Sequence, residues 1–209
     1  LQHADAALYK AKAEGRNVYR RYSETLTDEA RARLQLESRL RKAIENDGIG
    51  VHFQPIVEIA TGRIVGAEAL ARWTDPQEGS VPPARFIAVA EQTGAIGALG
   101  EAVLRRAVAE AARWSARGLP AIDLSVNVSP CQFESAAFAG RVFEILERGG
   151  LAPGRLVVEL TESALLGDAR AVAEGLARLR AGGVRIAIDD FGTGHSSLAR
   201  LQEFPIDTL

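Results

Sequence analysis

The sequence predicts an α/β fold, a (β/α)8 barrel of the TIM type with an antiparallel first strand, incomplete at its C-terminal end. From Gly50 onward, apolar segments of strand length alternate with amphipathic segments of helix length, a pattern typical of parallel strands covered by helices. The first two strand segments are joined only by a short turn around Thr61 and Gly62, so we expect this pair to be antiparallel. A complete barrel takes about 250 residues, whereas only about 160 follow Gly50, so we expect at least two strands to be absent.

An open, doubly wound sheet would produce the same alternation of strands and helices. Such sheets commonly carry a glycine-rich dinucleotide fingerprint directly after a strand, and no strand segment here is followed by one. This observation favours the barrel. The predicted strands are 51–57, 63–70, 122–128, 156–161 and 184–189, with another beginning at Ile206, and the predicted helices are 83–92, 98–117, 135–147, 169–181 and 196–202.

The N-terminal part of the chain reads as a separate unit. Residues 3–14 predict a helix and residues 17–22 a short aromatic strand, and nothing upstream could pack against this pair. We therefore interpret residues 1–22 as the end of a preceding domain rather than a free appendage. Residues 23–49 are a linker with a charged helix, capped by Thr27, that leads into the main domain at 50–209.

The bulk composition excludes several classes of protein. The net charge of −2 gives no basic surface for nucleic acid, and no run of about eighteen apolar residues exists that could span a membrane. Cys131 is the only cysteine, so there is no internal disulfide and no sign of an oxidising compartment. We expect a cytoplasmic domain. The chain begins at Leu1 and contains no methionine, so we expect both ends to be cut from a longer parent, which upstream segments could anchor to a membrane.

Acidic and amide side chains recur at the C-terminal ends of the predicted strands, where barrel enzymes place their active sites. They are Glu68, Asn127, Glu159, Asp189 and Asp190, and they come from four different strands. Period-two alternation puts Ser125 and Asn127 on the face opposite Leu124 and Val126, away from the covering helices. A single carboxylate at a strand end is more often a helix cap or a surface charge. Agreement among four strands argues instead for one shared site.

A cluster of carboxylates indicates a bound cation. Two like charges about 4 Å apart repel by roughly 4 kcal/mol at an effective dielectric constant of 20, and a divalent ion removes that cost. The candidate ligands are all oxygens, which favours Mg²⁺ or Mn²⁺ over Zn²⁺. The adjacent pair Asp189 and Asp190 could share two ions, as in two-metal hydrolysis of phosphodiesters.

Five segments in order and spacing resemble the EAL domain, the family of cyclic di-GMP phosphodiesterases. They are Gln54-Pro55-Ile56-Val57, Glu68-Ala69-Leu70-Ala71-Arg72-Trp73, Asn127-Val128-Ser129, Glu159-Leu160-Thr161-Glu162 and Asp189-Asp190-Phe191-Gly192-Thr193-Gly194. The segment Ala4-Asp5-Ala6-Ala7-Leu8-Tyr9 with Gly15-Arg16-Asn17 resembles the end of a GGDEF domain, the family that makes cyclic di-GMP. The signature loop of that family is absent, so we expect no cyclase activity from this chain and a tandem parent protein.

The resemblance to the EAL family implies a role for each matched residue. The first metal ion is expected on Glu68, Asn127, Glu159 and Asp189, and the second on Asp189 and Asp190. Arg72 is expected to hold a substrate phosphate with its guanidinium fork, and Gln54 to lie on the substrate floor. Glu162 is expected to stabilise the loop that contains Gly192, Thr193 and Gly194, which couples the metals to a homodimer interface. The implied reaction is attack of water on one phosphodiester of cyclic di-GMP, which gives linear pGpG.

Some of these residues could instead have purely structural roles. Arg72 could pair with a neighbouring carboxylate, and Gly192 and Gly194 could serve only a tight turn. The general-base lysine that the family implies would directly follow Leu209, so we expect the 209-residue chain alone to be inactive and poorly stable. A catalytically inactive sensor of cyclic di-GMP, or a protein-interaction scaffold, is the alternative function.

Overall fold

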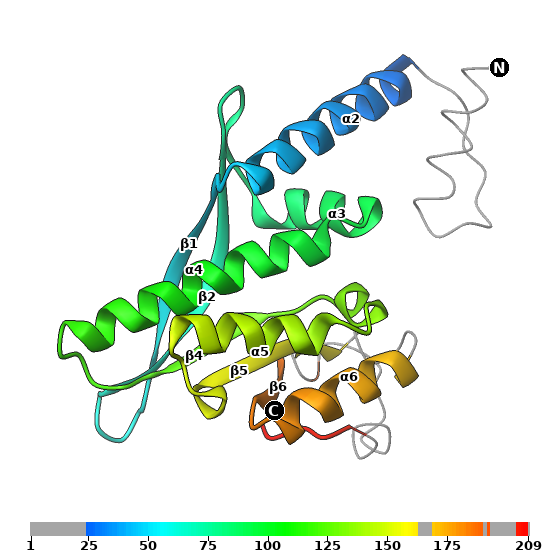
Figure 1. The fold of residues 1–209 in the computed structure, drawn as a ribbon. Coiled ribbons are helices and arrows are strands. Elements are labelled where there is room, and N and C mark those ends of the chain that lie inside the picture. Colours follow the sequence, from blue (N-terminus) through cyan, green and yellow to red (C-terminus); the bar gives the residue numbers. More distant parts are fainter. Residues whose placement is uncertain (1–23, 163–168, 190–191, 193–203, 209) are drawn as a thin grey trace.

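The computed structural model describes residues 24–162, 169–189, 192 and 204–208, and it shows a mixed α/β fold built on one sheet (Figure 1). The sheet has six strands in the order β1-β2-β4-β5-β6, and β3 pairs with β2 off this path. The strands are β1 (Ile49–Val57), β2 (Ile64–Asp75), β3 (Gly79–Val81), β4 (Asp123–Asn127), β5 (Leu156–Thr161) and β6 (Arg185–Asp189). The helices are α2 (Glu24–Glu45), α3 (Pro83–Thr93), α4 (Ile96–Ala116), α5 (Phe138–Gly149) and α6 (Ala169–Ala181), with short 3-10 helices η1 (Pro130–Glu134) and η2 (Pro153–Arg155).

The strand directions confirm the predicted fold class. β1 pairs antiparallel with β2 through a turn at Gly62, whose φ is 70°, and β2, β4, β5 and β6 are all parallel. The segment before Leu209 continues the series, because Thr208 bridges in parallel to Ala187 and its carbonyl accepts the Ile188 N–H at 3.0 Å. The strand predicted to begin at Ile206 therefore starts beside β6. Among the described residues the ring is not seen to close, since β1 lies at the other edge.

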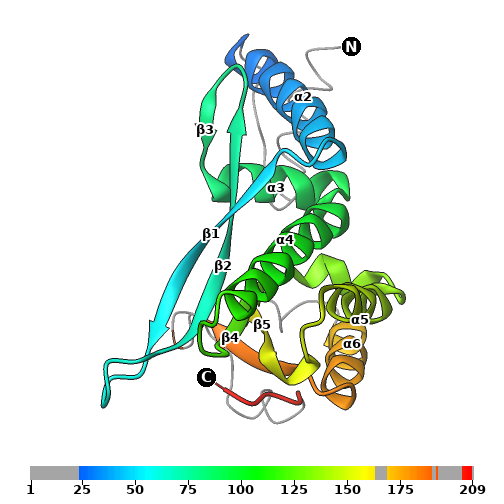
Figure 2. The same ribbon diagram turned by 60° about the vertical axis from the view of Figure 1, so that its left-hand side comes forward.

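The helices α4, α5 and α6 lie together on one side of the parallel strands (Figures 1 and 2). Alternate residues of each strand supply the apolar face beneath them, and these residues are buried in one core cluster with the helices. They include Leu124, Val126, Leu156, Val158, Leu160, Ile186 and Ile188. The period-two prediction is therefore confirmed, and the opposite face of the same strands is left for polar side chains.

Several element boundaries differ from the sequence prediction. Thr27, predicted to cap the linker helix, lies within α2 (Glu24–Glu45) and not at its first residue. β2 runs on to Asp75, since β3 folds back onto its end through a turn at Gly79 with φ 76°. The helix predicted near residue 135 starts at Phe138, because η1 occupies the preceding residues. The predicted N-terminal remnant at 1–22 and the helix at 196–202 lie outside the described residues.

A second apolar cluster joins α2 and α3 to the long hairpin of β1 and β2. Leu36 and Leu40 of α2, each 1% exposed, contact this cluster, and Phe86 of α3 is completely buried in it. The Phe86 ring meets the Trp73 ring edge to face, with centroids 5.9 Å apart. This packing fixes β2, which carries Glu68, relative to the helices that follow it.

An ion pair at the end of β2 anchors α2. Asp75 is 1% exposed and accepts hydrogen bonds from the backbone N–H groups of Gln77 at 2.8 Å and Glu78 at 2.9 Å, and from Arg39 Nε at 2.8 Å. Burial on its own would raise the pKa of Asp75, but the two backbone hydrogen bonds and Arg39 outweigh it, so the pKa lies below its ordinary value. The charged form of Asp75 is thus the one that the fold stabilises.

Asp75→Asn should therefore destabilise the protein at neutral pH, by about 1–3 kcal/mol, because the charge that these donors stabilise is lost. A carboxyl whose pKa is depressed in the folded state contributes stability above its unfolded pKa of about 3.9, and that contribution disappears as pH falls through the folded value. Urea unfolding of the wild type and the variant should show the difference at pH 7 and a smaller one near pH 3. Glu78→Gln, at a more exposed partner of Arg39, is the control. An equal difference at both pH values would contradict this account.

Candidate metal and substrate site

Four of the predicted ligands lie on neighbouring strands. Asn127 and Asp189 end β4 and β6, and Glu159 lies near the end of β5. Glu68, predicted near a strand end, instead lies inside β2, because β3 pairs with the residues that follow it and extends the strand to Asp75. Glu68 lies level with Ser125 across β2 and β4, and Asn127 lies level with Glu159 across β4 and β5. Asp189, the last residue of β6, is level with Thr161. Because β4, β5 and β6 are neighbouring parallel strands, their C-terminal ends meet at one edge of the sheet, and the register of β2 with β4 brings Glu68 close to that edge.

The side chains of this group contact and influence one another. Asn127 Nδ2 donates a hydrogen bond to Glu68 Oε1 at 2.6 Å. The pKa of Glu159 is raised, chiefly because the side chain is removed from water and further by the negative charges of Glu68 and Asp189, while a hydrogen bond from the Ser125 hydroxyl opposes the rise. Glu159 therefore lies between two negative charges of the group, which disfavour its ionised form.

The donor chemistry of this group fits an oxygen-preferring divalent ion. Three carboxylates and one amide lie on neighbouring strands, and the negative charges of Glu68 and Asp189 add to the raised pKa of Glu159. In the part of the chain that the structure describes, no three His, Cys, Asp or Glu side chains lie close enough together to hold a metal ion. Asp190, the fifth predicted ligand, lies outside that part.

The two predicted substrate residues flank the acidic group. Gln54 of β1 is level with Glu68 and exposed, and Arg72 lies four residues beyond Glu68 on the same face of β2. Arg72 is partly buried, and its Nη1 donates to the carbonyl oxygen of Ala71 at 2.8 Å. Within the described residues no ion pair joins Arg72 to a carboxylate, so the structure there gives no support to a role of Arg72 in a simple ion pair.

The predicted contact between Glu162 and the following loop is present at one residue. Glu162 is 3% exposed, and its Oε2 accepts the N–H of Gly192 at 2.9 Å. Gly192 has φ 90°, a conformation that side-chain-bearing residues rarely adopt. Thr193 and Gly194 lie outside the described residues, so the coupling of this loop to a dimer interface stays a prediction.

The turn after Asn127 is stabilised by two residues, Ser129 and Gln132, that were not among the predicted site residues. Ser129 caps η1, its N–H donates to Gln132 Oε1 at 3.0 Å, and its hydroxyl donates to Glu91 of α3 at 2.7 Å. A Cβ on Gly100 of α4 would come within 2.3 Å of Gln132 Nε2, so the glycine makes room for this side chain. The capping-box spacing of Ser129 and Gln132 was the available signal. The turn ties the end of β4 to both helices.

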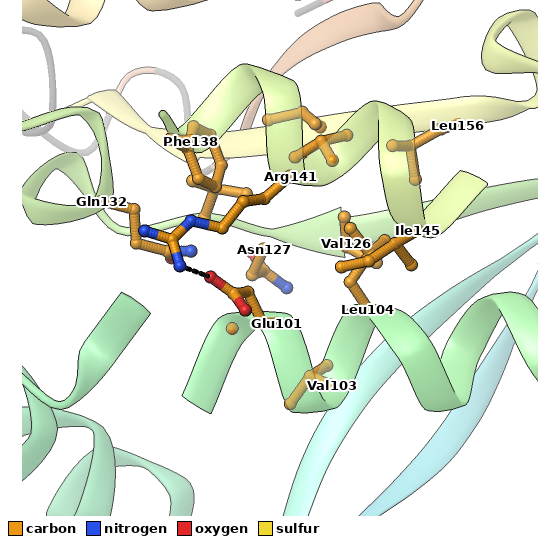
Figure 3. Close-up of a pocket in the computed structure, with 14 residues that line it drawn as sticks. Glu101, Val103, Leu104, Val126, Asn127, Gln132, Phe138, Arg141, Ile145 and Leu156 are labelled. Atoms are coloured by element: carbon orange, nitrogen blue, oxygen red, sulfur yellow. Dashed lines mark ion pairs between the residues drawn. The ribbon is translucent and has the colours of Figure 1, made fainter. Parts of the chain in front are cut away.

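A small cavity between α4, α5 and β4 lies on the helix side of the sheet (Figure 3). It is lined mainly by apolar side chains such as Leu104, Val126 and Ile145, and Arg141 Nη1 pairs with Glu101 at 3.2 Å at its rim. Its volume of about 20 Å³ holds roughly one water molecule. The cavity is a packing defect behind β4 rather than a substrate site.

The fold and the acidic group define a class of protein, an α/β protein of parallel strands with an oxygen-donor site at the strand ends. The sequence model of the EAL domain family matches residues 37–209 of this chain. The chain therefore belongs to the EAL domain family. EAL structures have a TIM-like barrel, in agreement with the predicted fold class. No helix among the described residues is long and apolar enough to cross a membrane.

Several curated proteins are similar over the whole chain. An uncharacterized signaling protein of Caulobacter vibrioides is 47% identical over 209 residues, which are 100% of this chain and 25% of that protein. The bifunctional diguanylate cyclase/cyclic di-GMP phosphodiesterase MucR of Pseudomonas aeruginosa is 41% identical over 99% of this chain and 30% of its own length. The cyclic di-GMP phosphodiesterase NbdA of the same organism is 40% identical over 100% of this chain and 27% of its length. The chain thus spans about a quarter to a third of these relatives.

Solved structures agree with this assignment. The PaMucR phosphodiesterase in complex with c-di-GMP superimposes with a TM-score of 0.76 and 41% identity, over 83% of this chain and 70% of that one. The EAL enzyme Bd1971, in its form bound to cAMP and cyclic di-GMP, has a TM-score of 0.77 and 29% identity, over 86% of this chain and 50% of that one.

Proposed function

We propose that the protein hydrolyses cyclic di-GMP to linear pGpG, and that this chain carries its metal ligands and part of its substrate site. The observation that carries the proposal is the arrangement of four oxygen-donor residues on four neighbouring strands, with Asn127 hydrogen-bonded to Glu68 at 2.6 Å; the four are Glu68, Asn127, Glu159 and Asp189. Membership of the EAL family supports the substrate, because MucR and NbdA are named for this activity and the MucR structure is a complex with c-di-GMP.

The residues have distinct tasks in this proposal. Phosphodiesterases of the EAL family depend on divalent metal ions. Bound Mg²⁺ or Mn²⁺, two ions in all, would activate a water nucleophile and stabilise the charge on the attacked phosphate. Glu68, Asn127, Glu159 and Asp189 would hold one ion, and Asp189 with Asp190 the other. The sheet places these residues on adjacent strands, and their side chains would move closer together on binding, because no three acidic side chains of the described residues lie close enough to hold an ion.

The substrate residues act on the other side of the phosphate. Arg72, next to the acidic group on β2, would bind a nonbridging phosphate oxygen once its guanidinium leaves the Ala71 carbonyl. Gln54, level with Glu68 on β1, would contact the substrate from below. We also propose that the protein acts in the cytoplasm as a homodimer that associates through the EAL domain.

Incubation of the full-length protein with cyclic di-GMP and Mg²⁺ or Mn²⁺, followed by chromatography of the nucleotides, tests this function. We expect pGpG to accumulate, and we expect EDTA to stop its formation until excess metal is restored. Glu68→Ala should abolish the product while the fold is retained. Binding of cyclic di-GMP without product, unaffected by Glu68→Ala, would overturn the enzymatic proposal in favour of the sensor.

A further inference from the structure

His52 lies on the same face of β1 as Gln54, the face that carries the candidate substrate site. Residues directly opposite one another in an antiparallel pair project to the same face of a sheet, and so do alternate residues of one strand. On this face β1 and β2 form three cross-strand pairs, which are Gln54 with Glu68, His52 with Leu70 and Gly50 with Arg72. His52 therefore lies between the level of Glu68, a proposed metal ligand, and the level of Arg72, the proposed phosphate-binding residue.

The His52 side chain is exposed and contributes little to the packing of the fold. Its neighbours Val51 and Phe53 point to the other face and pack against the apolar clusters beneath the helices. Among the residues that the structure describes, neither ring nitrogen of His52 takes part in a hydrogen bond or an ion pair. The imidazole ring is thus held on a strand and is accessible to a ligand.

Leu70, opposite His52, is an apolar side chain on the polar face of the sheet. It is partly exposed and, unlike Ala69 and Trp73 on the other face, belongs to neither apolar cluster of the described residues. The Cβ atoms of directly opposed residues lie about 4.5–5.5 Å apart, so the imidazole ring and the Leu70 side chain form one contact surface. A nucleobase, which has apolar faces and polar edges, fits such a surface better than a phosphate does.

Gly50 leaves room beside the His52 ring. It is the residue of β1 opposite Arg72, and it presents no side chain on this face. A Cβ at Gly50 would come no closer than 3.5 Å to the nearest atom of β2, so packing within the protein does not require the glycine. Gly50 and His52 are about 6.8 Å apart along the strand, which is enough for one flat base. A base in this space would lie beside a phosphate bound by Arg72, as the two groups of one nucleotide do.

We propose that His52 is a substrate-binding residue, whose imidazole ring stacks on one guanine base of cyclic di-GMP next to Leu70. The inference rests on the proposed function, because it assigns His52 to the substrate of that function. Nucleobases stack on histidine and other aromatic side chains, and loss of such a contact typically weakens binding by about 5- to 150-fold. The contact is made equally in the bound substrate and in the transition state, so its loss should raise KM and leave kcat nearly unchanged.

The test is titration calorimetry of the full-length protein with cyclic di-GMP in EDTA, so that binding is measured apart from turnover. His52→Ala should bind about 5- to 150-fold more weakly than the wild type. His52→Phe, which keeps a flat aromatic ring, should bind nearly as tightly as the wild type, whereas His52→Gln, which keeps only hydrogen-bonding groups, should bind as weakly as His52→Ala. Ile56→Ala is the matched control, because it truncates an exposed side chain on the same face of β1, on the side of Gln54 away from Arg72.

The outcomes separate this inference from the proposed function. Wild-type affinity in His52→Ala, or an equal loss in Ile56→Ala, overturns the role of His52 and leaves the proposed function intact. Tight binding by His52→Gln and weak binding by His52→Phe overturn stacking in favour of a hydrogen bond. If the wild type binds only with Mg²⁺ present, KM values replace the dissociation constants in the same comparison, and a lower kcat with unchanged KM in His52→Ala refutes the inference. Neither binding nor hydrolysis by the wild type overturns the proposed substrate, and with it this inference.

Discussion

Glu159→Gln should lower kcat for cyclic di-GMP hydrolysis on the order of 1000-fold. The substitution keeps the shape of the side chain and removes the charge at the centre of the acidic group, where Glu68 and Asp189 both act on it. A metal ion contributes several kcal/mol to stabilisation of the transition state, and each 1.36 kcal/mol corresponds to about tenfold in rate. Steady-state kinetics at saturating Mg²⁺ measure the effect.

The same substitution should not weaken the metal-free fold. A carboxyl whose pKa is raised in the folded state is disfavoured there as an anion, so at neutral pH its charge opposes folding. The neutral glutamine removes that penalty, and the Tm of the metal-free variant should equal or exceed that of the wild type. Glu147→Gln, an identical change at an exposed residue of α5, controls for the chemistry of the substitution. Full activity of the Glu159→Gln variant would show that Glu159 is not a metal ligand.

Phe86→Ala should destabilise the protein by about 3–5 kcal/mol, the usual cost of a cavity left by a buried phenylalanine. Phe86 is completely buried between α3 and the hairpin, and its ring contacts the Trp73 ring edge to face. Because the same cluster packs Leu36 and Leu40 of α2, the loss extends to the anchoring of that helix. Urea denaturation followed by circular dichroism measures the change in the free energy of unfolding.

Ile59→Ala provides the reference for this measurement. Ile59 lies fully exposed in the turn between β1 and β2, so its truncation should change stability by less than about 0.5 kcal/mol. Similar losses for the two variants would show that the second apolar cluster does not stabilise the fold. A large loss only for Phe86→Ala supports its role as the joint between α3 and the strand that carries Glu68.

Much of the candidate site was predictable because its signals are local. The alternation of Ser125 and Asn127 with Leu124 and Val126 is a property of a single strand, and it assigned the polar face that the structure shows. The antiparallel first pair followed in the same way from the short turn at Gly62.

The contacts between elements were not predictable in the same way. The hydroxyl of Ser129 donates a hydrogen bond to Glu91, which lies 38 residues earlier in the chain. Asp75 accepts a hydrogen bond from Arg39, which lies 36 residues earlier. Nothing in the local pattern links such residues, because the link depends on how α2 and α3 pack against the hairpin. The extension of β2 to Asp75 likewise depends on β3 folding back onto it.

Strand periodicity and short motifs involve neighbouring residues, so the amino-acid sequence was enough to predict the fold class, the family and the candidate ligands. The contacts between these ligands depend on the tertiary structure. The neighbours β2 and β4 bring Asn127 Nδ2 within 2.6 Å of Glu68 Oε1, and the register of β4 and β5 sets Asn127 level with Glu159. Strand order and register arise from long-range packing, and a shift of one residue would turn every one of these side chains to the opposite face.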